Sequence, residues 1–167
     1  MARLSPLAAA LLLFSAWYAA RPQGLPWQSA AQEQPEQPAV RYEFPEQVSI
    51  AAGKPAAVDL HFRIRDGLHI NSHQPLQKSL IRTELIVMEP SGVSIASVDF
   101  PPGAVYASQA LPADKLSVYT GEFVLHAHLT ARAGEHLVQA ALRYQACDAN
   151  ACYPPRKAPV AFDLVAK

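Results

Sequence analysis

The stretch VDLHFRIRDG, residues 58–67, carries the pattern that decides the fold of this chain. Its apolar residues stand at every second position and alternate with Asp, His and Arg. Successive side chains of a β-strand point to opposite faces, so this alternation predicts a strand with one buried face. The Asp-Gly pair at its end predicts a turn, because both residues tolerate the backbone conformations that turns require.

The same alternation returns between Val40 and Lys167, interrupted by turn signatures rich in Pro and Gly. Further strands are expected in 80–88, 93–99, 122–129, 138–144 and 160–164. About seven or eight short strands without a helical period predict an all-β fold, an immunoglobulin-like antiparallel β-sandwich, with a barrel as the alternative. The segment Tyr106–Leu116 is polar, rich in Ala and irregular, and it is predicted to be a long loop.

The composition is that of one globular domain, without the excess of basic residues that is typical of nucleic-acid-binding proteins. The 167 residues include 14 basic and 14 acidic side chains, and half of all residues are hydrophobic. No basic stripe favours nucleic acid, and we expect a monomer that binds none. The 15 prolines disfavour long helices and suit short strands joined by turns.

The N-terminal residues have the features of an export signal. Arg3 precedes the apolar run Leu7–Ala20, which is short for a membrane span. Residues 1–20 are therefore expected to be a signal peptide, with an uncleaved anchor as the alternative. Residues 21–39, rich in Pro and Gln, are expected to be a disordered linker before the domain 40–167. The expected location is the periplasm, with the domain either free or tethered by its N-terminal segment.

The chain has two cysteines, Cys147 and Cys152, separated by Asp148–Ala151. In an exported protein such a pair can form a lasting disulfide. As a structural bond it closes a very short loop and stabilises by only ~2 kcal/mol, against ~4–5 kcal/mol for a loop of about 100 residues. As a redox pair, one thiol can form a mixed disulfide that the other resolves. On chemistry alone both interpretations stay open.

A copper or zinc carrier is a third possibility, because the chain has six histidines and two soft sulfur ligands. His61, His126 and His128 fall on the polar faces of predicted strands, where solvated imidazoles are usual, and no metal site is assigned. The sequence lacks the G-x-S-x-G and H-E-x-x-H motifs of hydrolases.

The stretch YQACDANACYPP, residues 144–155, resembles the active-site hairpin of the N-terminal periplasmic domain of DsbD, the thiol:disulfide interchange protein. Three weaker similarities lie upstream of the hairpin, in the same order as in the family: FRIRDGLHINSHQPL, DFPPGAVY and LSVYTGEFVL. Together they span roughly residues 40–165. The hairpin positions that match are Tyr144, Gln145, Ala146, Cys147, Cys152, Tyr153, Pro154 and Pro155.

This resemblance implies an immunoglobulin-like domain that relays electrons and takes part in cytochrome c biogenesis. Its cysteine pair would receive electrons from a membrane-embedded thiol donor. It would pass them to oxidised periplasmic proteins of the thioredoxin-like or disulfide-isomerase kind. Cys152 would be the sulfur exposed to the partner and Cys147 the resolving thiol. No cofactor is expected, because the two sulfurs carry both electrons.

The resemblance also suggests which residues surround the pair. Tyr144, Tyr153, Pro154, His69 and Asn71 are expected beside the hairpin. In the family a cap loop shields the pair, and Tyr106 or Leu111 is the candidate lid, although the acidic-aromatic cap motif is missing here. Longer family members continue into a membrane domain and a thioredoxin-like domain, so the sequence is expected to be a stand-alone version or a fragment.

Overall fold

The computed structural model describes residues 37–43, 47–88, 92–107 and 115–167. The expected signal peptide and most of the expected linker lie outside these ranges. The described residues form twelve strands and no helix, hence no helix that could cross a bilayer. The strands are β1 Val40–Tyr42, β2 Gln47–Ile50, β3 Ala56–Ile64, β4 His69–Asn71, β5 Glu84–Met88, β6 Val93–Asp99, β7 Ala104–Ala107, β8 Lys115–Tyr119, β9 Glu122–Ala131, β10 Gly134–Tyr144, β11 Ala146–Cys147 and β12 Arg156–Ala166.

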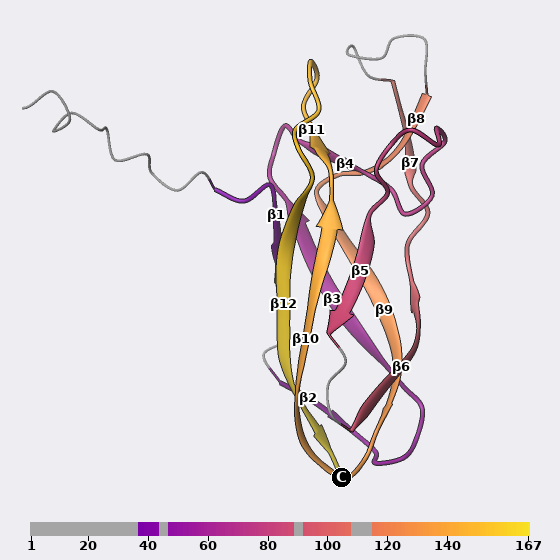
Figure 1. Cartoon of the computed structure of the whole chain (residues 1–167), viewed down its shortest axis with the longest axis vertical. Helices are drawn as coiled ribbons and strands as arrows, with labels where there is room; N and C mark the ends of the chain where they lie inside the picture. The colour runs from indigo at the N-terminus through magenta and orange to yellow at the C-terminus, as the bar shows by residue number, and fades with distance from the viewer. Residues whose placement is uncertain (1–36, 44–46, 89–91, 108–114) are drawn as a thin grey trace, which may run out of the picture. The chain divides into compact units, whose positions relative to one another are not determined.

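Two four-stranded sheets form the predicted sandwich of immunoglobulin type (Figure 1). Sheet A has the strand order β1-β3-β9-β6, and sheet B has the order β2-β12-β10-β5. All strand pairs in them are antiparallel except β2 and β12, which run parallel. The predicted all-β sandwich is confirmed, with this one parallel pair as an exception that the sequence pattern did not indicate.

The alternating apolar residues of the sequence line the space between these two sheets. Buried side chains from β3 and β9 of sheet A pack with those from β10 and β12 of sheet B in one cluster. Aromatic rings add specific contacts to it: Phe62 and Phe123 stack with centroids 5.2 Å apart. Such burial is the main favourable term in folding, so the alternating strands carry most of the stability of the domain.

A third sheet, with the order β11-β4-β8-β7, lies at the end of the domain opposite the C-terminus (Figure 1). The predicted loop over Tyr106–Leu116 was wrong at its first and last residues, which belong to strands of this sheet. Tyr106 lies on β7 and pairs with Leu116 on β8, while residues 108–114 lie outside the described ranges. Strands this short contain too few alternations to stand out in the sequence, and their partner strands stabilise them.

Leu142 and Leu137 lie on the same strand, β10, and provide a matched test of the core. Leu142 is 0% exposed and Leu137 is 55% exposed. We expect Leu142→Ala to lower the free energy of unfolding by about 2–5 kcal/mol, because it leaves a cavity in the core. Leu137→Ala should change it by less than about 0.5 kcal/mol. Urea denaturation of both variants measures this, and equal losses would contradict the described packing.

Candidate functional site

Cys147 and Cys152 are joined by a disulfide, with an S–S distance of 2.02 Å and Cα atoms 3.9 Å apart. Cys147 belongs to the short strand β11, and the two cysteines face each other as an antiparallel bridge. The residues between them make the turn. The pair therefore crosses a tight hairpin that extends from the end of β10 (Figure 1).

The two sulfur-bearing residues differ in their access to solvent. Cys147 is 1% exposed, whereas Cys152 and the residues after it up to Lys157 are exposed. Cys147 is buried where its strand β11 joins the third sheet and pairs with β4. An incoming protein thiol can reach Cys152 directly, but it cannot reach Cys147 without displacing its cover.

The carboxylate of Asp148 organises the turn between the cysteines. Its Oδ1 accepts hydrogen bonds from the backbone N–H groups of Asn150, at 2.7 Å, and Ala151, at 2.8 Å. Its Oδ2 accepts a hydrogen bond from the hydroxyl of Tyr153. These bonds, the one from Tyr153 first, hold the pKa of Asp148 below its ordinary value. The turn therefore keeps a negative charge next to the disulfide at neutral pH.

Hydrogen bonds that do not involve sulfur attach the hairpin to β4. The side-chain amide of Asn71 donates to Ile81 O at 3.0 Å and to Gln145 Oε1 at 3.3 Å. Gln145 in turn donates to the carbonyl of Tyr153 at 3.2 Å, and Tyr153 N donates to Ala146 O at 2.8 Å. Gln145 matched the family pattern, but no sequence motif indicated that its amide connects both arms of the hairpin.

His69 lies directly opposite Cys147 in the pairing of β4 with β11. It is 2% exposed, and its ring packs against that of Tyr106 from β7, with centroids 4.4 Å apart. Burial lowers the pKa of His69, and the negative charge of Asp148 partly offsets this. His69 and Tyr106, distant in the sequence, thus meet next to the buried cysteine.

The other residues expected around the pair take different positions. Tyr144 is buried in the sandwich core at the end of β10, where burial raises the pKa of its hydroxyl. Tyr153 and Pro154 are exposed after Cys152. Leu111 lies outside the described residues, so of the two lid candidates only Tyr106 has a described position.

Two of the histidines considered for metal binding are each paired with a carboxylate. His126 Nδ1 lies 2.7 Å from Asp59 Oδ1, and His128 Nε2 lies 2.8 Å from Asp99 Oδ2, all on the outer face of sheet A. Within the described ranges no three His, Cys, Asp or Glu side chains gather as a metal site would require. His61 is exposed on β3. These residues support no metal site in the described part of the chain.

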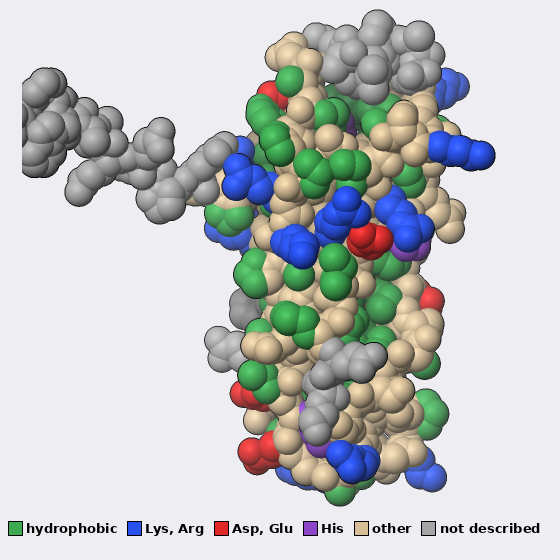
Figure 2. All heavy atoms as spheres, in the orientation of Figure 1, with side chains coloured by type: hydrophobic (Ala, Val, Ile, Leu, Met, Phe, Trp, Pro, Cys, Tyr) green, Lys and Arg blue, Asp and Glu red, His purple; other side chains and the backbone are tan. Residues whose placement is uncertain are grey.

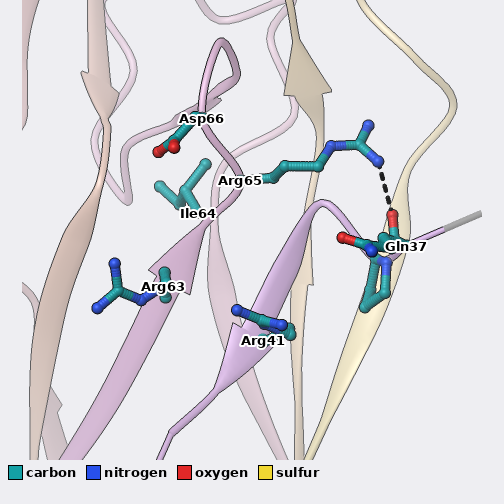
Figure 3. Close-up of a pocket in the computed structure, with 7 residues that line it drawn as sticks. Gln37, Arg41, Arg63, Ile64, Arg65 and Asp66 are labelled. Atoms are coloured by element: carbon teal, nitrogen blue, oxygen red, sulfur yellow. Dashed lines mark hydrogen bonds between the residues drawn. The ribbon is translucent and has the colours of Figure 1, made fainter.

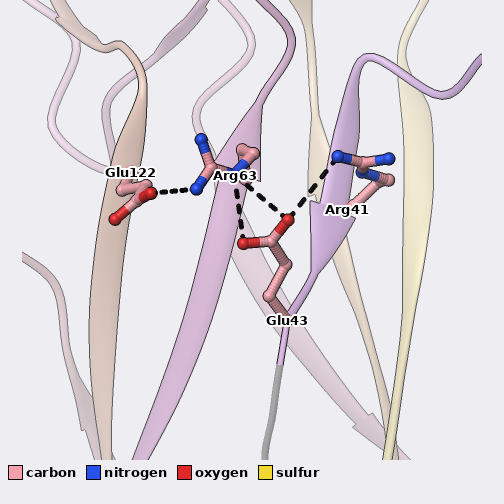
Figure 4. A network of polar contacts seen from close by, with 4 residues as sticks. All are labelled: Arg41, Glu43, Arg63 and Glu122. Carbon is pink, nitrogen blue, oxygen red and sulfur yellow. Dashed lines mark hydrogen bonds and ion pairs between the residues drawn. The ribbon is translucent and has the colours of Figure 1, made fainter.

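A hollow of about 340 Å³ beside β1 and β3 is lined by several arginines (Figure 3). Arg65 donates to the carbonyl of Gln37 at 2.8 Å, and Arg63 binds the carboxylates of Glu43 and Glu122 (Figure 4). Arg41 lies 3.6 Å from the same Glu43. These cations have acidic or carbonyl partners, and the lining contains no nucleophile, so the hollow is a weaker candidate than the hairpin.

Basic side chains also form a band across the outer face of sheet B (Figure 2). Glu84, Arg143 and Lys157 occupy one row across β5, β10 and β12. Glu84 accepts hydrogen bonds from Arg143 at 2.8 Å and from Arg82 at 3.3 Å, and these interactions lower the pKa of its carboxyl. Exposed pairs of this kind contribute little to stability.

Removing the hydroxyl of Tyr153 tests the role of Asp148. In Tyr153→Phe we expect the pKa of Asp148 to rise toward its ordinary value, because its strongest hydrogen bond is lost. Since that pKa is lowered in the folded state, the turn is stabilised above about pH 4 and loses this contribution as pH falls below it. NMR titration of the carboxyl carbon measures the shift. Tyr42→Phe, on β1, is the control and should leave Asp148 unchanged.

Comparisons with known proteins give one family model and a similar solved structure. The family model "Thiol:disulfide interchange protein DsbD, N-terminal" matches residues 30–164. One similar solved structure is the Neisseria meningitidis DsbD N-terminal domain in the reduced form, with 19% sequence identity. The match covers 62% of this chain and 74% of that chain, with a TM-score of 0.39. The comparison with curated proteins finds no match. Because the family model spans most of the sequence, the predicted resemblance is confirmed, and the chain belongs to the family of DsbD N-terminal domains, whose general chemistry is thiol:disulfide interchange.

Proposed function

We propose that this domain relays two electrons in the periplasm through the Cys147–Cys152 pair. It accepts them from a membrane-embedded thiol donor and delivers them to oxidised exported proteins of the thioredoxin-like or disulfide-isomerase kind. The observation that carries the proposal is the unequal exposure of the two cysteines in one disulfide. A relay needs one sulfur that meets the partner and a second that is protected until the mixed disulfide has formed.

In the accepting half-reaction a donor thiolate attacks Sγ of Cys152. The Cys147–Cys152 bond breaks, and Cys147 leaves as a thiolate and takes up a proton. The second thiol of the donor then attacks the donor sulfur of the mixed disulfide and releases Cys152 as a thiolate. The domain is now reduced by two electrons and the donor holds the disulfide.

In the delivering half-reaction the Cys152 thiolate attacks a disulfide of the substrate protein. One substrate sulfur leaves as a thiolate, and a mixed disulfide joins Cys152 to the other. Cys147 loses its proton and attacks Sγ of Cys152, which restores the internal disulfide and releases the second substrate sulfur as a thiolate. The pair holds both electrons between the two halves, so no cofactor takes part.

The surroundings of the pair support the assigned roles. Tyr106 packs over His69 on the buried side, as a residue that shields Cys147 would. Tyr153 and Pro154 flank the exposed cysteine and offer an apolar rim to a partner. Residues 1–20 are proposed to export the chain and residues 21–39 to link that segment to the domain 40–167.

The alternative is an immunoglobulin-like binding module with a purely structural disulfide. The hydrogen bonds through Asn71, Gln145 and Asp148 disfavour it, because they hold the hairpin in shape without the sulfur bond. A bond across so short a loop would add only ~2 kcal/mol.

Single cysteine variants test the roles of the two sulfurs. We expect Cys147→Ser to form a stable mixed disulfide through Cys152 with oxidised thioredoxin-like proteins, because the resolving thiol is missing. Cys152→Ser should form it at least about tenfold more slowly, because Cys147 is buried and an incoming disulfide cannot reach it directly. Non-reducing electrophoresis and mass spectrometry of the trapped peptide measure this. Equal trapping by both variants would contradict the assignment.

The reduction potential separates the relay from a structural bond. We expect the purified domain to have a potential above about −300 mV, since bonds below that value resist reduction by cellular thiols. Equilibration in glutathione or dithiothreitol buffers, followed by alkylation of free thiols, gives the value. A much lower potential would favour the structural alternative.

A further inference from the structure

His69 has a buried ring nitrogen that lacks a hydrogen-bond partner. Its Nε2 is inaccessible to solvent and bonds to no group among the described residues. Most buried polar atoms in folded proteins are paired, so an unpaired one requires an explanation. The explanation here lies in the position of His69 relative to the cysteines.

His69, Cys147 and Cys152 occupy a single row across neighbouring strands. Cys147 is directly opposite His69 on β4 and, on its other side, directly opposite Cys152. Residues directly opposite in an antiparallel pair project from the same face, with Cβ atoms about 4.5–5.5 Å apart. The imidazole is therefore the side-chain neighbour of the buried sulfur on the side away from the disulfide.

This corner of the site is closed to water. Both His69 and Cys147 are almost fully buried, and the ring of Tyr106 packs against the imidazole. Burial away from water in general disfavours the charged thiolate relative to the neutral thiol. Resolution of a mixed disulfide nevertheless requires the Cys147 thiolate. The buried thiol needs a proton acceptor that water does not supply.

We infer that His69 is the acid–base residue of Cys147. This rests on the proposed exchange function and adds a group to its mechanism. In the delivering half-reaction Nε2 takes the proton of the Cys147 thiol, and the thiolate then attacks Sγ of Cys152 and displaces the substrate sulfur. In the accepting half-reaction the imidazolium returns that proton to Cys147 as the internal disulfide breaks. In the oxidised state the sulfur carries no proton, which accounts for the unpaired nitrogen.

The charges around His69 fit a group that is neutral at rest and briefly cationic. Burial lowers its pKa, so the ring is neutral and free to accept a proton. Asp148, in the hairpin turn, opposes this shift and stabilises the imidazolium once it forms. Within the described part of the chain, Cys147 from β11 and Tyr106 from β7 also face the imidazole.

The test follows the two steps separately in the reduced domain with the aromatic disulfide dithiobis-nitrobenzoate. Attack by Cys152 releases one nitrothiobenzoate, and resolution by Cys147 releases a second. We expect His69→Gln to leave the first phase within about twofold of the unmodified domain and to slow the second at least about tenfold near pH 7, where even a solvent-exposed thiol is only about 3% ionised. The difference between the two proteins should shrink as the pH is raised, because the thiol then ionises without a protein base. The matched control, His61→Gln on β3, removes an exposed imidazole and should change neither phase.

The outcomes distinguish this inference from the proposed function. If the unmodified domain releases no second nitrothiobenzoate at any pH, the exchange function itself fails. If it does, and His69→Gln shows the same rates, or a loss that is equal at every pH, the acid–base role is overturned.

A measurement on the unmodified domain covers the case in which His69→Gln does not fold. Nitrogen-15 NMR of the imidazole should show that the Nε2 resonance of His69 moves when the disulfide is reduced, while those of His61 stay in place. An unchanged Nε2 resonance would overturn the inference.

Discussion

The pairing of β11 with β4 is the contact on which the site depends. At Tyr144 the chain leaves sheet B, and Ala146 and Cys147 join the third sheet opposite Ile70 and His69. Had β10 continued in sheet B, both cysteines would extend into solvent beyond the sandwich. The change of sheet buries Cys147 and leaves Cys152 outside. The proposed division of roles between the two sulfurs rests on this difference.

The polar contacts of the hairpin complement that pairing. Asn71 and Gln145 connect β4 to both arms, and Asp148 holds the turn through backbone N–H groups and Tyr153. Since none of these bonds involves sulfur, opening the disulfide leaves them in place. The hairpin can therefore keep its shape in both redox states, which keeps the two thiols near each other.

The sandwich serves this end of the domain as a scaffold. Its long central strands, β3, β9, β10 and β12, bury one continuous apolar core and present mostly paired charges on their outer faces. The arginines beside β1 and β3 and the band on sheet B belong to this exposed surface, where ion pairs contribute little. The proposed thiol-disulfide exchange site lies at the end where the third sheet meets the hairpin.

The long strands, the sandwich and the family could all be predicted from the amino-acid pattern. The apolar residues of 58–64 and 122–129 alternate because one face of each strand is buried, and this alternation predicts the strands. The cysteine hairpin has a specific residue pattern, and this pattern predicts the family. Four features become visible only in the folded chain: the strands β7 and β8, the parallel pairing of β2 with β12, the burial of Cys147 and the register that places His69 directly opposite it. These features arise where short segments distant in the chain meet, and a segment of two to four residues has no periodicity from which its partner can be predicted.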